Sequence, residues 1–153
     1  MVFASDAEGQ FDIYIVPSDG GKPRNITSHP AMEHVPNFSS DGKWIYFSSN
    51  RSGRHQVWKV PVEGGGPAGE VLQGVLNGAF QVVERGIYYI DQASAKSTLR
   101  FFDFAGRRSV AIAGDLGQAD EIGGFAASRD GRTVLYVKRD SSVDDLMPVE
   151  HFK

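Results

Sequence analysis

A repeat of 42 to 47 residues is the feature of this sequence that most constrains its fold. Short apolar segments begin at Ile13, Val57, Leu99 and Leu146, in steps of 44, 42 and 47 residues. A second set of apolar segments precedes them and keeps the same steps, at residues 2–5, 46–49, 88–91 and 135–138. Self-similarity at a fixed period indicates an array of one structural unit, so the chain is predicted to repeat one supersecondary motif.

Glycine turns separate the strands predicted within each repeat. The pairs Asp41-Gly42, Arg85-Gly86 and Asp130-Gly131 come just before three of the second-set segments. Asp-Gly favours a tight hairpin whose central residues need positive φ. Each repeat therefore predicts four short strands joined by turns, which is a four-stranded antiparallel meander.

The apolar pattern of these strands predicts that the meanders stack face to face. Residues 44–47 are apolar at four consecutive positions, so both faces of that strand need cover. Four-stranded repeats of about 40 to 45 residues are typical of β-propeller blades. We expect an all-β partial propeller over residues 1–153, with approximate repeats at 1–30, 31–74, 75–118 and 119–153.

Residues 70–76 are the one segment where a short helix competes with a strand. Nearby glycines favour an outer strand followed by a crossing loop. The aromatic residues at repeat-matched strand positions are predicted to pack between blades rather than to stack on bases or sugars. These residues are Trp44, Tyr46, Phe47, Trp58, Tyr88, Tyr89, Phe101 and Phe102.

Composition and charge argue against several classes of partner and chemistry. The net charge is −3 and the basic residues are scattered, so neither nucleic acid nor an anionic membrane is an expected partner. No apolar run approaches the roughly 20 residues of a membrane-spanning helix. The absence of cysteine excludes disulfides, thiolate metal sites and cysteine nucleophiles.

The motifs of common enzymes are missing or lie in the wrong context. Residues 64–69 match G-x-G-x-x-G, but no helix or βαβ unit follows, so they are predicted to form a loop. Asp41 and Asp130 sit beside turn glycines and are predicted to bond their own turns. No carboxylate pair or G-x-S-x-G elbow stands out. We therefore predict no catalytic residue, no cofactor and no metal.

Residues 36–53, continuing to Val57 and Trp58, closely resemble the blade motif of TolB-like, WD-repeat-like bacterial propellers. That motif reads P-x-[FW]-S-x-D-G, an apolar strand, S-x-R-x-G and then [IVL]-[YW]. The first repeat keeps the later half at residues 5–14, and the last keeps the earlier half at residues 125–131. The third repeat retains little more than Phe80 and Gly86.

This resemblance implies a non-catalytic sensor or interaction propeller of a larger bacterial protein, which binds a protein or small ligand. It also implies a periplasmic rather than a cytoplasmic location. Two alternatives stay open: an accessory propeller of a prolyl-oligopeptidase-like or tricorn-like peptidase, and a metal-bearing propeller of a polysaccharide lyase. The lyase alternative predicts several histidines at equivalent repeat positions.

The motif, laid on a blade, identifies candidate contacts at the mouth of the central channel. Glu33 and His34 come just before the strand that faces the channel, Asn77 is taken as the equivalent position in the next repeat, and Asp120 and Glu121 in the last. These five residues are the candidate ligand or partner contacts. His29, His55 and His151 fall at other repeat positions, so no convergent metal site is predicted.

An open arc of blades predicts self-association. The repeat pattern predicts fourteen strands and begins inside a blade, as expected for part of a longer propeller. Propeller rings close with four to eight blades, and an unclosed arc leaves apolar faces exposed. A twofold pair of chains would cover these faces, so we predict a homodimer that closes the ring.

Overall fold

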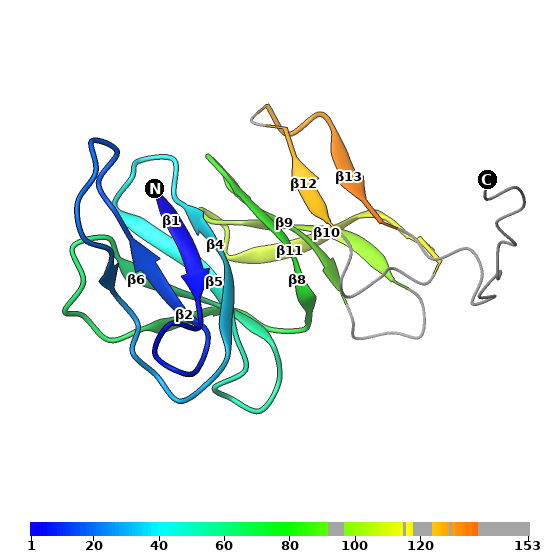
Figure 1. Cartoon of the computed structure of the whole chain (residues 1–153). Helices are drawn as coiled ribbons and strands as arrows, with labels where there is room; N and C mark the ends of the chain where they lie inside the picture. Colours follow the sequence, from blue (N-terminus) through cyan, green and yellow to red (C-terminus); the bar gives the residue numbers. More distant parts are fainter. Residues whose placement is uncertain (92–96, 115, 118–123, 129, 138–153) are drawn as a thin grey trace, which may run out of the picture.

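The computed structural model describes residues 1–91, 97–114, 116–117, 124–128 and 130–137, and this part of the chain contains strands and turns without a helix. Thirteen strands in these ranges form four antiparallel sheets of three, four, four and two strands. Figure 1 shows the sheets following one another in chain order, from the blue first sheet to the orange fourth sheet. The all-β propeller prediction is confirmed.

Each sheet is a meander in which strands that are neighbours in sequence are neighbours in space. The first sheet contains β1 (Val2–Ser5), β2 (Asp12–Ile15) and β3 (Arg24–Asn25). The second contains β4 (Glu33–Phe38), β5 (Trp44–Ser49), β6 (Gln56–Pro61) and β7 (Gly69–Leu72). The third contains β8 (Val75–Val83), β9 (Gly86–Asp91), β10 (Thr98–Asp103) and β11 (Arg108–Ala113), and the fourth contains β12 (Phe125–Ala127) and β13 (Val134–Tyr136).

The ambiguous segment at residues 70–76 is resolved in favour of strands. It contributes to β7, the outer strand of the second sheet, and to the start of β8. Residues 64–68 lie in the connection between β6 and β7, as predicted for a loop, and Gly69 begins β7. The strand predicted near Leu146 lies outside the described residues, and the repeat boundaries remain predictions.

Two hairpin turns repeat the same side-chain hydrogen bonds. The Ser39 hydroxyl donates to Asp41 Oδ1 at 2.6 Å, the Lys43 amide donates to Asp41 Oδ1 at 3.1 Å, and the Trp44 amide donates to Ser39 Oγ at 3.0 Å. The same three bonds join Ser128, Asp130, Arg132 and Thr133. The serine hydroxyl, followed by the turn amide, lowers the pKa of each aspartate. The prediction that Asp41 and Asp130 form turns is confirmed.

The glycines of the three turns predicted from sequence have two different physical roles. Gly42 and Gly131 have φ values of 69° and 68°, whereas Asp41 does not have positive φ, contrary to the prediction for both central residues of its turn. Gly86 has no positive φ, but an added Cβ would lie 2.0 Å from the Phe102 carbonyl oxygen. Close packing, rather than a left-handed backbone, therefore requires glycine at residue 86.

The core consists of side chains packed between successive sheets. Along β5, Ile45 and Phe47 pack with Ile13 of the first sheet, whereas Tyr46 packs with Phe80 of the third sheet. This alternation follows from the period of two in a strand. All eight aromatic residues predicted as core are buried or partly buried. Between the third and fourth sheets, the core contains Leu76, Ala79 and Ile90, with Phe125 and Tyr136 against them.

We predict that Phe80→Ala destabilises the chain much more than Phe38→Ala. Phe80 is 1% exposed within the core, whereas Phe38 is 39% exposed. Removing a buried phenylalanine should lower the free energy of unfolding by about 3–5 kcal/mol, and removing the exposed one by less than about 1 kcal/mol. Urea unfolding followed by tryptophan fluorescence measures both values, and equal losses would contradict the packing described here.

Candidate functional site

The first strands of the second and third sheets lie next to each other, and the candidate site is built where they begin. β4 contacts β8, and β8 in turn contacts β12 of the fourth sheet. Each of these strands is at the end of its sheet's strand order. The starts of β4 and β8 therefore bring His34 and Val35 close to Gly78.

Glu33 and His34 are consecutive residues whose side chains lie on opposite faces of the second sheet. In the β4–β5 pairing, Glu33 lies opposite Ser49 and His34 lies opposite Ser48. We call the packing interface between two successive sheets a seam. Successive side chains of a strand point to opposite faces, so Glu33 faces the seam between the first and second sheets and His34 faces the seam between the second and third. The two candidate residues therefore belong to different polar clusters.

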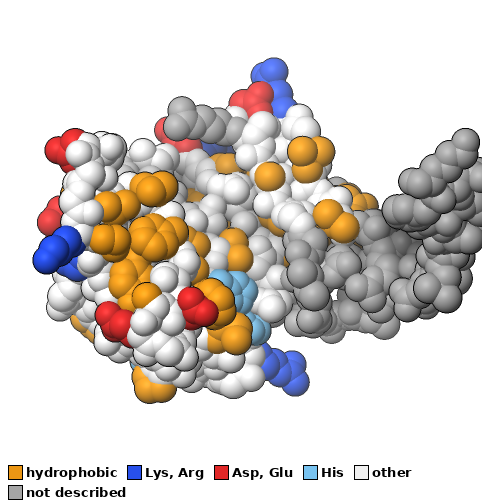
Figure 2. All heavy atoms as spheres, viewed as in Figure 1, with side chains coloured by type: hydrophobic (Ala, Val, Ile, Leu, Met, Phe, Trp, Pro, Cys, Tyr) orange, Lys and Arg blue, Asp and Glu red, His pale blue; other side chains and the backbone are white. Residues whose placement is uncertain are grey.

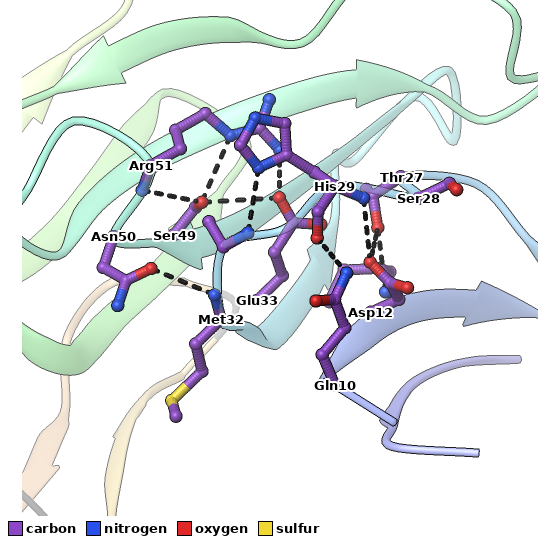
Figure 3. Close-up of polar contacts among 12 residues, drawn as sticks. Gln10, Asp12, Thr27, Ser28, His29, Met32, Glu33, Ser49, Asn50 and Arg51 are labelled. Carbon is purple, nitrogen blue, oxygen red and sulfur yellow. Dashed lines mark hydrogen bonds and ion pairs between the residues drawn. The ribbon is translucent and has the colours of Figure 1, made fainter. Parts of the chain in front are cut away.

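The Glu33 cluster is a buried ion pair, shown in Figure 3. Arg51 Nη2 donates to Glu33 Oε1, Ser49 Oγ donates to the same oxygen at 3.3 Å, and Arg51 Nε donates to Ser49 Oγ at 3.2 Å. The Arg51 guanidinium also lies 4.8 Å from the ring centroid of Trp58. The structure thus places Glu33 inside the sheet pair, fully buried, rather than at an open rim as the sequence predicts.

Asp12 anchors the loop that leads into β4, and sequence reasoning did not identify it as a site residue. Its buried carboxylate accepts hydrogen bonds from Asn25 Nδ2 at 3.0 Å and from the His29 amide at 3.2 Å. His29 Nδ1 accepts from the Ala31 amide at 3.1 Å. Figure 3 shows Asp12 and His29 beside the Glu33 pair. These bonds order residues 25–32, which set the path of the chain into Glu33 and His34.

The His34 cluster contains a second histidine that the sequence prediction excluded. The ring centroids of His34 and His55 are 5.0 Å apart with an interplanar angle of 54°. Ser48 Oγ lies 3.2 Å from His55 Nδ1. His55 is at a different repeat position, as the sequence indicates, but it still lies beside His34 because Ser48 pairs with both His34 and Val57. His55 is two residues before Val57 and so returns to the same face.

Asn77 and Gly78 bring the third sheet against this histidine pair. A Cβ added to Gly78 would lie 3.7 Å from His34 Cε1 and 3.0 Å from Val35 Cγ2. Asn77 Oδ1 is buried and has no well-formed hydrogen bond among the described residues. The Asn77 side chain lies close enough to the His34 ring to raise the pKa of that imidazole through a hydrogen bond to its protonated form.

The strand register corrects the repeat equivalence of Asn77 and His34. Val75 lies opposite Asp91, the last residue of β9, as Glu33 lies opposite Ser49, the last residue of β5. The next residue, Leu76, is therefore the counterpart of His34. Asn77 reaches the cluster because the pairing of β8 is irregular between Val75 and Phe80.

The backbone directly after His34 is strained. Val35 has a φ of 53°, and it lies within the register shift between His34 and Asn37. Positive φ is a genuine outlier for a β-branched residue. Gly78 lies in the irregular stretch of β8 and has a φ of 73°. Glycine adopts this conformation without steric strain because it has no Cβ. Strain of this kind tends to occur at functional sites, so it favours His34 as a site residue.

Burial governs the electrostatics of His34. Desolvation lowers the pKa of His34, the neighbouring His55 lowers it further, and Asn77 acts weakly in the opposite direction. The neutral imidazole is therefore favoured at neutral pH. A neutral imidazole can accept a hydrogen bond or bind a metal ion.

Neutral polar side chains continue along the shared edge of β4 and β8. Gln81 Nε2 donates to Asn37 Oδ1 at 2.6 Å. The edge thus presents imidazole and amide groups that can donate and accept hydrogen bonds. Asp120 and Glu121, the remaining predicted contacts, lie outside the described residues. Within the described ranges, no group of three or more His, Cys, Asp or Glu side chains is placed to hold a metal ion.

A sequence comparison relates the whole architecture to a known family. The model of the TolB beta propeller domain matches residues 1–151. The Tol-Pal system protein TolB of Bordetella pertussis is 44% identical over 54 residues, which cover 35% of this chain and 12% of that protein. The chain spans 12–18% of the first curated relatives that it matches.

Two solved structures share the fold at low sequence identity. TolB from Acinetobacter baumannii matches with a TM-score of 0.71 at 18% identity, over 92% of this chain and 35% of that chain. The tricorn protease matches with a TM-score of 0.58 at 16% identity, over 88% of this chain and 18% of that chain. No helix in the described part is long and apolar enough to cross a membrane.

We predict that the free energy of unfolding falls as the pH falls below about 6.5, the ordinary histidine pKa, in part because of His34. The folded chain lowers the pKa of His34, so the unfolded chain binds more protons between the lowered value and the ordinary one. The contribution of His34 to the free energy of unfolding is fully present above the ordinary histidine pKa. It is lost as the pH falls toward the lowered pKa of His34 in the folded chain.

The test is urea unfolding at pH 7.5 and 5.5 in the presence of EDTA. The difference between the two pH values should shrink in His34→Gln and stay unchanged in His29→Gln, which alters a histidine of the other cluster. A full pH dependence retained in His34→Gln would show that other groups cause it.

Proposed function

Because this chain belongs to the TolB beta-propeller family, we propose that it is a non-catalytic propeller scaffold that binds a protein or small ligand at the edge shared by β4 and β8. The observation that carries this proposal is the row of neutral polar groups on that edge, formed by His34, Asn77, Asn37 and Gln81. In a closed propeller, the innermost strand of each blade lines the central channel, so this row would face a ligand there.

The chemistry of the row suits recognition through hydrogen bonds. Asn77 Oδ1 is a buried acceptor without a well-formed partner among the described residues, and the neutral form of His34 offers a donor and an acceptor. Buried polar groups are normally hydrogen-bonded, so a ligand that supplies a donor would gain from binding here. The relative from Bordetella pertussis is named as a protein of the Tol-Pal system, which supports a role in an assembly of proteins.

A second candidate is an accessory propeller attached to a peptidase. The fold likeness to the tricorn protease supports it. In this case the chain would still act through binding rather than catalysis, and its channel would hold a peptide. Turnover of peptide substrates by the purified chain would contradict both candidates.

Site-specific photo-cross-linking tests the binding edge. We expect benzoylphenylalanine at position 77 to cross-link a partner protein in cells that produce the chain, because this position lies on the shared edge. The control is position 110, where Val110 is 45% exposed on the outermost strand of the third sheet. Adducts formed from position 110 but not from position 77 would place the binding surface elsewhere.

We also propose that two chains associate to cover their exposed apolar faces. Leu135 of the fourth sheet is 67% exposed and Phe11, next to β2, is 42% exposed. On the first sheet, the rings of Phe3 and Tyr14 stack with centroids 5.9 Å apart. Figure 2 shows hydrophobic side chains gathered over the first sheet. Exposed apolar surface of this kind is typical of association sites.

We predict that the chain of 16.7 kDa has twice this mass in solution, and that Leu135→Glu shifts it toward the monomer. A buried charge at a dimer interface has no partner and weakens association. Light scattering and sedimentation across a range of concentrations measure the mass. Ile112→Glu, at a residue 53% exposed on β11, is the matched control that should remain dimeric. A folded wild-type monomer at micromolar concentration would refute the dimer.

A further inference from the structure

The distance between His34 and His55 matches that of two imidazoles bound to one metal ion. Their ring centroids are 5.0 Å apart. An ion about 2.0–2.1 Å from a ring nitrogen lies roughly 3.2 Å from the ring centroid, so two rings bound at a tetrahedral angle have centroids about 5 Å apart. The observed separation is therefore compatible with an ion bound between the rings.

Neighbouring polar atoms complete the features of a metal site. Ser48 Oγ lies 3.2 Å from His55 Nδ1, and a bond from Nδ1–H to this hydroxyl would leave Nε2 as the metal-binding nitrogen. Asn77 Oδ1 is a buried oxygen without a well-formed hydrogen bond, on a side chain within reach of His34. It can serve as a third ligand, with water as a fourth.

The electrostatic state of the pair also suits a metal ion. Metal-binding histidine must be neutral, and both burial and His55 lower the pKa of His34. The nearby carboxylate of Glu33 lies on the other face of the sheet, where it pairs with Arg51. The strained φ of Val35 holds the chain at His34 in an unusual path, as expected where side-chain placement matters.

We propose that His34 and His55, together with Asn77 Oδ1, bind a divalent transition metal ion at the seam between the second and third sheets. Imidazole ligands suit Zn²⁺, Cu²⁺ and Ni²⁺, whereas Ca²⁺ and Mg²⁺ prefer sites made of oxygen ligands. The ion would join β4 and the start of β6 to β8, and so would hold two blades together. This site goes beyond the scaffold function and does not depend on it.

Calorimetric titration of the EDTA-treated, dialysed chain with ZnCl₂ and NiCl₂ tests the proposal. We expect one ion per chain, with affinity about tenfold or more lower in His34→Ala and in His55→Ala, since each loses a ligand. His29→Ala is the matched control and should bind as the wild type does, because the bond of His29 to Asp12 comes from its backbone amide, which the substitution keeps. Asn77→Asp should bind more tightly, since it replaces an amide oxygen with a carboxylate.

A second measurement keeps the test decisive if a histidine variant fails to fold. Zinc added to the wild-type chain should shift the imidazole ¹⁵N resonances of His34 and His55 together and leave those of His29 unchanged. The proposal is overturned if these two histidines show no shift, if the double variant His34→Ala, His55→Ala binds as tightly as the wild type, or if His29→Ala loses affinity to the same extent.

Discussion

Face-to-face packing of the sheets is the constraint on which the rest of this structure depends. The central strand β5 is buried on both faces, with Ile45 and Phe47 packed toward the first sheet and Tyr46 toward the third. A sheet of this kind is stable only between two neighbours, because exposing either face would return apolar area to water. The same requirement explains why the motif recurs along the chain.

The seams between the sheets also determine where polar chemistry can occur. Removing one partner from a buried ion pair leaves an uncompensated charge, so Glu33 and Arg51 are expected to act together as a structural unit. The neighbouring residue, His34, lies at the opposite seam with a different set of partners. Two consecutive residues thus serve two seams, one with a charge paired through Glu33 Oε1 and the other with neutral groups that retain capacity for a ligand.

The candidate site was only partly predictable from sequence. The blade motif led to Glu33, His34 and Asn77, and the structure brings His34 and Asn77 to one seam while it buries Glu33 at the other. Asp120 and Glu121 stay predictions. His55 was missed because its closeness to His34 arises across an intervening strand, and Asp12 because its carboxylate acts on a loop well separated in sequence. The repeat step of 42 residues and the strand register both make Leu76 the counterpart of His34. Asn77 reaches the cluster only through the irregular pairing of β8, which the sequence does not reveal.

The sequence by itself determined the repeat, the all-β class, the turn chemistry of Asp41 and Asp130 and the aromatic core, because these depend on short-range patterns of polarity and on local hydrogen bonds. Only the tertiary structure decided which polar residues meet, because this depends on strand register, on bulges and on the face that each side chain occupies. A shift of one residue reverses that face, so small irregularities in β4 and β8 determine the composition of each seam. The pairing of His34 with His55 is the clearest result of that rule.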